Sequence, residues 1–319
     1  MNEFKNTPIK VAIVGSGPSG FFVAESLINS GIEVEVTILE RLPTPYGLVR
    51  YGVAPDHQKL KSVSQTLEAI AQNPAITFLG NVKVGSDDLT LSQLRSLFHI
   101  VVLTTGMPKG SQLGLVGEDL EGVHTSSDFI GWYNGHPDSQ DIKFDLSQSS
   151  AVIIGHGNVA IDICRILTKP IDELKKSDIT EQALELLSRS KIQRVHLVGR
   201  RGPVQAKFTT KELHELGKLE NCHVTVDPKN MNLGMACHLE LNDPSNIVTR
   251  KNHSIYEAYS QNFNSKPTNP KKHISIDFMM NPKEFVGSER IEKIIFERTK
   301  LDGPALSQKS VSTGSLIEI

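Results

Sequence analysis

Short apolar runs alternate with amphipathic stretches near the N-terminus, in the order strand, helix, strand. Residues 9–14 are almost wholly apolar and predict a buried parallel strand. Residues 21–30 predict a helix that ends at Gly31, and residues 34–39 alternate into a second strand. The pattern continues with a predicted helix at 63–71 and predicted strands at 76–84 and 99–103.

The same order of elements returns in the middle of the chain. Residues 151–154 predict a strand, residues 158–167 predict a helix, and residues 195–198 predict its partner strand. The chain is therefore expected to be an α/β protein with two doubly wound, mostly parallel, Rossmann-like dinucleotide-binding domains, at 1–106 and 107–319.

The segments around these units are polar or rich in Pro and Gly. Residues 41–57, RLPTPYGLVRYGVAPDH, predict a long loop, and long ordered loops are usually functional. Residues 117–149 predict an irregular connection, whereas residues 227–272 are polar with weak periodicity. We also expect a helix that begins with a capping box of Asp178 and Glu181 and runs through Ser190. Closing strands are expected at 274–280, 291–298 and 315–319.

A glycine-rich fingerprint follows the first strand of each unit. The first is GSGPSG, with Gly15, Gly17 and Gly20, and the second is GHGNVA, with Gly155, Gly157 and Ala160. An isolated match of this kind is weak evidence, but here each one follows a predicted strand and opens a predicted helix. Such glycines let the backbone approach a pyrophosphate, and the helix N-terminus supplies N–H donors.

The two fingerprints are followed by opposite charges. Glu40 closes the second strand of the first unit, where a carboxylate accepts hydrogen bonds from a ribose 2′-hydroxyl. Arg200 and Arg201 close the partner strand of the second unit, where a guanidinium matches a 2′-phosphate. The pattern predicts FAD in the first site and NADP(H) in the second, and hence hydride transfer.

Composition narrows the class of partner. The chain has 319 residues and a net charge of −2, which gives no support for nucleic acid or a membrane surface. Its apolar runs are too short to span a bilayer.

The three cysteines, Cys164, Cys222 and Cys237, form no CxxC and no cluster, so we expect no metal site, no disulfide framework and an external electron acceptor. We expect a cytoplasmic protein, or a mitochondrial matrix protein if a transit peptide has been removed.

Four polar residues have both a functional and an ordinary interpretation. His57 ends the Pro- and Gly-rich loop, and Asp162 lies on the helix after GHGNVA; the pair could steer protons, or each could be structural. Glu212 could contact a nucleotide or be a solvated helix residue. His156 could be a ligand, although we favour a solvent-facing filler that contributes mainly its backbone.

Four stretches together resemble the adrenodoxin reductase family of ferredoxin–NADP(+) reductases. They are LPTPYGLVRYGVAPDH, FIGWYNG, GHGNVAIDICRIL and VGRRGPVQAKFTTKEL. The resemblance implies hydride transfer from NADPH to FAD and then single-electron transfer to an iron–sulfur ferredoxin. It places FAD against the loop from Gly15 to Gly20, Ser19, Glu40, Leu48 and Val84, and NADP(H) against His156, Gly157, Asn158, Val159, Arg200, Arg201 and Glu212. It also implies that His57 and Asp162 are near the redox centre.

One departure from the family concerns length. Its members continue well past the point that matches Ile319, so we expect a C-terminally truncated chain whose first domain is incomplete. Two other functions stay open from the sequence. One is a truncated, non-catalytic NADP-binding remnant, and the other is an NADPH-dependent flavin subunit that feeds electrons into a larger enzyme.

Overall fold

The chain forms two compact units in a computed structural model that describes residues 7–86, 89–107, 110–265 and 272–319. Both are α/β units of Rossmann type, each built on a four-stranded parallel sheet. Among the described residues, no helix combines the length and apolar character that a membrane crossing requires. Unit 1 comprises Met1–Gly110, Ile130–Asp141 and Ser177–Thr180, and unit 2 comprises Ser111–Phe129, Ile142–Lys176 and Glu181–Ile319.

The sheet of unit 1 has the order β3-β2-β1-β4, with every neighbouring pair parallel. Strands β1 (Ile9–Val14) and β2 (Val34–Leu39) have the predicted bounds, and β4 (Ile100–Leu103) begins one residue later than predicted. Strand β3 (Ile76–Leu79) is shorter than predicted. It ends because Asn81 takes a left-handed conformation, with φ 58°, which turns the chain out of the sheet.

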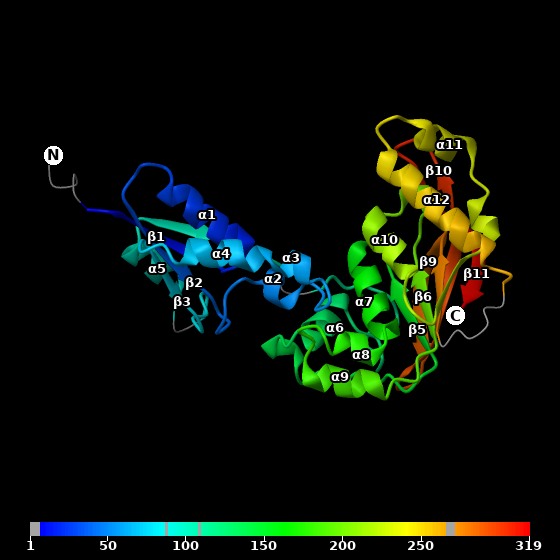
Figure 1. The fold of residues 1–319 in the computed structure, drawn as a ribbon, viewed down its shortest axis with the longest axis horizontal. Helices are drawn as coiled ribbons and strands as arrows, with labels where there is room; N and C mark the ends of the chain where they lie inside the picture. Colours follow the sequence, from blue (N-terminus) through cyan, green and yellow to red (C-terminus); the bar gives the residue numbers. More distant parts are fainter. Residues whose placement is uncertain (1–6, 87–88, 108–109, 266–271) are drawn as a thin grey trace. The chain divides into compact units, whose positions relative to one another are not determined.

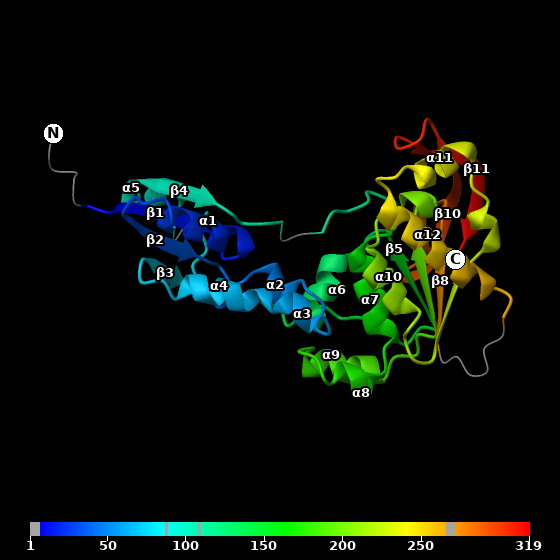
Figure 2. The ribbon, with the colours of Figure 1, turned by 45° about the horizontal axis from the view of Figure 1, so that its top comes forward.

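Helices cover both faces of this sheet (Figures 1 and 2). Helices α1 (Pro18–Ile28) and α4 (Val63–Ala71) bury Phe21 and Leu67 against Val11 and Ile38 on one face. Helix α5 (Leu91–Leu97) packs against the opposite face through Leu94. Helix α1 begins three residues before the predicted start because Pro18, whose fixed φ suits a first helical position, is already in its first turn.

The parallel sheet of unit 2 has the order β5-β6-β8-β7. Its core strands β5 and β6 lie where the apolar pattern predicts them. Helices α7, α10 and α12 lie against one face of this sheet (Figure 1). The bounds are β5 (Ser150–Ile154), β6 (Arg194–Val198), β7 (Cys222–Val226), β8 (Lys272–Asp277), α7 (Asn158–Thr168), α10 (Thr210–Leu216) and α12 (Ile247–Gln261).

An antiparallel sheet covers part of the other face of unit 2. It consists of β9 (Met280–Gly287), β10 (Ile291–Asp302) and β11 (Lys309–Glu318), drawn in orange and red in Figure 1. Phe285 and Phe296 pack there with Val198 of β6. The single strand predicted at 274–280 is divided between β8 and β9, because Met279 has a left-handed φ of 58°.

Several segments predicted to be irregular contain helices. The Pro- and Gly-rich loop includes α2 (Leu48–Tyr51) and is followed by α3 (Gln58–Lys61). The connection at 117–149 contains α6 (Ser126–Tyr133), and the polar segment at 227–272 contains α11 (Met235–Asn242) as well as α12. Two short helices follow α7: α8 (Ile171–Leu174) and α9 (Glu181–Ser188).

The expected capping box of Asp178 and Glu181 is wrong. Helix α9 begins at Glu181, so Asp178 lies two residues too early to be its cap. Its carboxylate instead accepts hydrogen bonds from Gln58 and from Lys61, the latter at 2.7 Å.

Candidate functional site

The first glycine loop joins β1 to α1 in a tight turn. The Gly15 N–H donates to the carbonyl of Leu39, the last residue of β2, at 2.8 Å. Gly15 has φ 107°, and a Cβ there would lie 2.3 Å from the Thr104 carbonyl oxygen. A Cβ on Gly20 would lie 2.2 Å from the Gly15 oxygen. Gly17 has no heavy atom within 4 Å of an added Cβ, so its side is open to a ligand.

Glu40 follows β2 directly and closes back onto this loop. Its Oε2 accepts from the Ser16 N–H at 3.0 Å and the Ser16 hydroxyl at 2.8 Å, and its Oε1 accepts from the Leu42 N–H at 3.1 Å. Ser16 is fully buried. A carboxylate oxygen has two lone-pair sites, so Oε1 of Glu40, which accepts only one of these bonds, retains capacity for a further donor such as a ribose hydroxyl.

The Pro- and Gly-rich segment is fastened to the same loop by its backbone. The Tyr46 N–H donates to the Ser16 carbonyl at 2.9 Å, and a Cβ on Gly47 would lie 3.0 Å from Cα of Gly17. Tyr46 has φ 85°, which is rare for a large side chain and marks a segment held by its surroundings. Leu48, which opens α2, is 67% exposed, so its apolar surface is available for contact.

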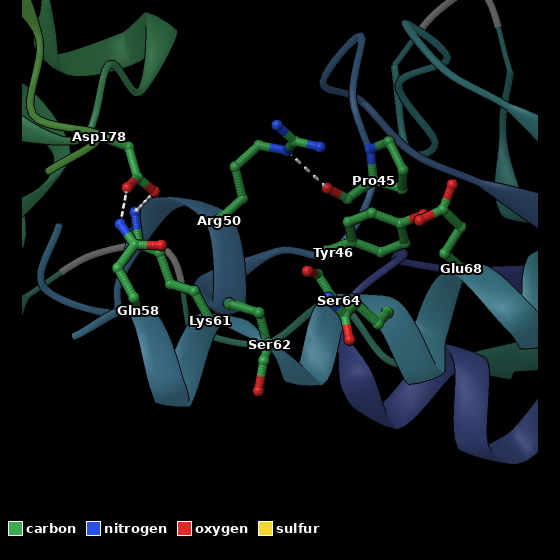
Figure 3. Close-up of a pocket in the computed structure, with 11 residues that line it drawn as sticks. Pro45, Tyr46, Arg50, Gln58, Lys61, Ser62, Ser64, Glu68 and Asp178 are labelled. Atoms are coloured by element: carbon green, nitrogen blue, oxygen red, sulfur yellow. Dashed lines mark hydrogen bonds and ion pairs between the residues drawn. The ribbon is translucent and has the colours of Figure 1, made fainter. Parts of the chain in front are cut away.

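A polar hollow of about 610 Å³ lies beside this segment in unit 1 (Figure 3). The Arg50 Nε donates to the Pro45 carbonyl at 3.1 Å, and its guanidinium lies over the Tyr46 ring, 5.6 Å from the centroid. Lys61 and Asp178 form an ion pair at its rim. None of the residues that the sequence assigns to FAD lines the hollow.

The remaining residues assigned to FAD are placed differently from one another. Ser19 is exposed in the first turn of α1, next to the open side of Gly17. Val84 is half-buried and packs with Val14 and Leu39 at the end of the sheet where Glu40 lies.

The second glycine loop repeats the geometry of the first. The Gly155 N–H donates to the carbonyl of Val198, the last residue of β6, at 2.8 Å, as Gly15 does to Leu39. Gly155 has φ 128°, and an added Cβ on Gly155 or Gly157 has no heavy atom within 4 Å. Ala160 is buried at the position that corresponds to Gly20, so this loop accommodates a methyl group where the first does not.

Asn158 and Val159 form the first turn of α7. The Asn158 Oδ1 accepts from the Thr209 N–H at 2.9 Å, which ties the turn to the segment before α10. Val159 is 48% exposed, and its backbone N–H belongs to the unsatisfied donors of a helix N-terminus. This turn can therefore receive an anionic group.

His156 is not a solvent-facing filler, contrary to the interpretation favoured from the sequence. Its ring lies between Phe208 and Phe278, with centroids 5.3 and 4.8 Å away, and its Nε2 donates to the Leu197 carbonyl at 3.0 Å. A Cβ on Gly199 would lie 2.3 Å from its Nδ1, so the ring fills the space above that glycine. Burial lowers the pKa of His156 to about 4 and keeps the ring neutral.

Arg200 and Arg201 begin the turn that follows β6. Arg200 is exposed and Arg201 is half-buried. Across the described part of the chain, neither guanidinium forms an ion pair with a carboxylate. Two cations therefore lie just after the strand that the second glycine loop contacts, and no carboxylate among the described residues is their counter-ion.

Asp162 and Glu212 are brought together by a residue that the sequence did not single out. Arg165 of α7 is buried, and its guanidinium contacts Asp162 at 3.0 Å, Glu212 of α10 at 3.2 Å and Glu215 at 3.9 Å. Glu212 is therefore a buried, ion-paired residue and not a solvated helix glutamate. The one signal of this cluster in the sequence is the spacing of Asp162 and Arg165, which are about one helical turn apart.

His57 belongs to unit 1, whereas Asp162 and Glu212 belong to unit 2. His57 precedes α3 with φ −96° and ψ 58°, and its carbonyl accepts from the N–H groups of Leu60 and Lys61. It therefore begins the helical turn after the Pro- and Gly-rich loop.

Known proteins resemble this chain over nearly its whole length. A scan against models of protein families gives no match. The mitochondrial NADPH:adrenodoxin oxidoreductase of Arabidopsis thaliana is 40% identical over 98% of this chain and 64% of its own length. NADPH-ferredoxin reductase FprA of Mycobacterium tuberculosis is 40% identical over 92% of this chain and 64% of its own length. The chain thus spans slightly less than two thirds of these relatives.

The fold agrees with solved structures of the same group. Mycobacterium tuberculosis FprA in complex with NADPH superposes with a TM-score of 0.91 at 38% identity, covering 98% of this chain and 69% of that chain. A mutant of the same protein superposes with a TM-score of 0.90. Sequence and fold together show that the chain belongs to the adrenodoxin reductase and FprA family of NADPH-ferredoxin reductases.

Proposed function

We propose that this chain binds FAD in the domain at 1–106 and NADP(H) in the domain at 107–319, and acts as an NADPH-dependent ferredoxin reductase. One observation carries the proposal. In both glycine loops the N–H of the first glycine donates to the carbonyl of the last residue of the partner strand. Glu40 follows one of these strands, whereas Arg200 and Arg201 follow the other. A carboxylate selects ribose hydroxyls, and a guanidinium pair selects a 2′-phosphate.

In unit 1 the glycine loop and the N-terminus of α1 would bind the FAD pyrophosphate. The open side of Gly17 gives the phosphates room, and Gly15 and Gly20 supply the close packing that shapes the turn. Glu40 would accept hydrogen bonds from the adenosine ribose. Further contacts are assigned to Ser19, Leu48 and Val84.

In unit 2 the N-terminal turn of α7 would bind the NADP(H) pyrophosphate. Gly157, Asn158 and Val159 present their backbone there. The neutral ring of His156 holds the loop by its hydrogen bond to the Leu197 carbonyl and its packing over Gly199. Arg200 and Arg201 would bind the 2′-phosphate. Glu212, held by Arg165, would lie at the border of the nucleotide site.

FAD, when bound, would accept hydride from NADPH and release electrons one at a time to an iron–sulfur partner. The partner is proposed from the relatives, whose names specify adrenodoxin and ferredoxin. His57 and Asp162 are the residues proposed to hold or move protons. Asp162 forms an ion pair with the buried Arg165 guanidinium at 3.0 Å, and a carboxylate is a side chain that can accept a proton.

We propose a reducing compartment, either the cytosol or the mitochondrial matrix. The three cysteines of the chain are free thiols, and Cys164 and Cys237 are buried. The Arabidopsis relative is named as mitochondrial, whereas the mycobacterial one is bacterial.

Anaerobic mixing of the FAD-saturated chain with NADPH tests the function. We expect NADPH to bleach the flavin absorbance, NADH to do so much more slowly, and reduction of cytochrome c to require added ferredoxin. A chain that binds NADP(H) but no flavin would be the non-catalytic NADP-binding protein. Flavin bleaching without transfer to any ferredoxin would favour the electron-input subunit of a larger enzyme.

A further inference from the structure

The turn that carries the two arginines is fastened to a sheet about a hundred residues later in the chain. The carbonyl of Arg200 accepts a hydrogen bond from the Thr299 hydroxyl of β10 at 2.8 Å and from the Ser310 hydroxyl of β11 at 2.7 Å. Both oxygens therefore converge on one peptide group, the one that joins Arg200 to Arg201.

A second path leads from the same turn to the same strand through Met279. The Met279 N–H donates to the Arg201 carbonyl at 3.2 Å, and the Thr299 N–H donates to the Met279 carbonyl at 2.9 Å. Met279 has a left-handed φ of 58°, which lets it face Arg201 and Thr299 at once. Together with the bond from the Thr299 hydroxyl to Arg200, these contacts form a closed ring of backbone and side-chain groups.

The residue before the arginines is also fixed on both sides. The Gly199 N–H donates to the Asp277 carbonyl at 2.9 Å, and the Gly199 carbonyl accepts from the Met280 N–H at 3.0 Å. The backbone from Gly199 to Arg201 is thus immobilised, while the exposed guanidinium of Arg200 remains available. Such an arrangement reduces the conformational entropy that a ligand must overcome on binding.

We infer that Thr299 and Ser310 are positioning residues for nucleotide selectivity. They hold the peptide from which both guanidinium groups extend, and so fix the distance between those groups and the glycine loop. The inference rests on the proposed NADP(H) site. The antiparallel sheet then has a role in selectivity as well as in covering the parallel sheet.

The positioning role predicts a selective loss. If the two hydroxyls are removed, the arginine turn gains freedom, and the 2′-phosphate of NADP+ loses part of its preorganised partner. NAD+ has no 2′-phosphate, so its affinity should stay unchanged. One hydrogen bond changes an equilibrium constant about fivefold, so we expect the ratio of NADP+ to NAD+ affinity to fall about tenfold or more when both are lost.

Calorimetric titration of the chain with NADP+ and NAD+ tests this inference, with Thr299→Val and Ser310→Ala made singly and together. Thr313→Val is the matched control, since its hydroxyl donates to the Arg298 carbonyl at 2.7 Å in the same sheet but does not contact the arginine turn. The control should keep the selectivity ratio of the unmodified chain. The unchanged NAD+ affinity reports that each variant is folded.

Two outcomes would overturn the inference separately from the proposed function. A double variant that keeps the full NADP+ preference would show that the hydroxyls do not position the arginines. An equal loss of both nucleotides, in the double variant or in Thr313→Val, would show a general structural role. If the unmodified chain shows no preference for NADP+, the proposed nucleotide assignment fails, and this inference fails with it.

Discussion

Glycines of the first loop have different steric roles, although the sequence pattern treats them alike. Gly20 lies where α1 crosses the loop, and a Cβ there would lie 2.2 Å from the Gly15 oxygen. Gly17 has ordinary extended dihedral angles, φ −72° and ψ 178°, and open space beside it. Gly20 is needed for the close packing of the fold, and Gly17 leaves room for the approach of a ligand.

Alanine at these two positions should therefore have separable effects. Gly20→Ala should lower the free energy of unfolding by about 1–3 kcal/mol, because the helix and the loop must move apart. Gly17→Ala should leave stability within about 0.5 kcal/mol but weaken FAD binding, since a methyl group occupies the space for the pyrophosphate. Urea unfolding and FAD titration of both variants measure this, and equal stability losses would contradict it.

The buried ring of His156 predicts a pH dependence of stability. Its folded pKa of about 4 lies below the unfolded value of about 6.5, so the unfolded state binds more protons between these values. Stability from this residue is fully present above pH 6.5 and is lost as the pH falls toward 4, by up to about 3 kcal/mol.

Unfolding free energies from pH 7 to pH 4 test the role of His156. His156→Gln should flatten the pH profile, since Gln can still donate to the Leu197 carbonyl but does not titrate. His238→Gln, at an exposed position of α11, is the control and should leave the profile unchanged. A His156→Gln profile as steep as that of the unmodified chain would rule out this account.

Two helices of unit 2 are joined by one buried cation. Arg165 of α7 contacts Asp162 on its own helix and Glu212 and Glu215 on α10. Its side chain is 2% exposed and that of Glu212 is 9% exposed, so water has little access to this pair. The relative placement of α7 and α10, and hence of the proposed proton-handling residue Asp162, depends on this cluster.

Removal of that cation should be costly. Arg165→Leu should reduce the free energy of unfolding by about 3–5 kcal/mol, because the buried carboxylate of Glu212 loses this cation. Arg189→Leu provides the comparison: Arg189 forms an exposed pair with Glu185 at 2.6 Å, and its loss should cost less than about 1 kcal/mol. Chemical denaturation of the two variants measures both values. A small loss in Arg165→Leu would show that the cluster does not hold the helices.

Elements with a clear apolar period were predictable, and those without one were not. Strands β1 and β2 and helix α4 have their predicted bounds because each buries an apolar stripe. Helix α12 was missed because its buried face consists of Asn252, Tyr256 and Tyr259, which do not form an apolar stripe. Asn252 and Tyr259 donate to carbonyls of Phe208 and Leu213, bonds that only the folded chain reveals.

The candidate site divides in the same way. The glycine loops and the charged residues after the strands are local in sequence, so motif spacing was enough to place them. Arg165, Thr299 and Ser310 act through contacts between distant segments, and their sequence surroundings carry no motif. Their roles depend on strand register and helix packing, which the sequence pattern alone does not determine.

At the scale of the whole molecule, one chain contains the same strand–loop–helix unit twice, with an acidic residue after the partner strand of one unit and two arginines after that of the other. Substitutions should therefore act on one nucleotide at a time. Glu40→Arg should abolish FAD retention and leave NADP+ affinity intact, whereas Arg200→Ala with Arg201→Ala should erase the preference for NADP+ and leave FAD bound. Glu35→Arg, at an exposed position of β2, the strand that Glu40 follows, is the charge control. Loss of both nucleotides in either variant would argue against independent sites.

Titration of NADP+ into the FAD-saturated chain tests the central claim most directly. We predict one NADP+ per chain with no release of FAD, and NAD+ binding at least about 100-fold weaker, since each of two charge-assisted contacts to the 2′-phosphate contributes about 1.5–3 kcal/mol. Displacement of FAD by NADP+, or equal affinity for NADP+ and NAD+, would contradict the claim that the chain holds two sites selective for different dinucleotides.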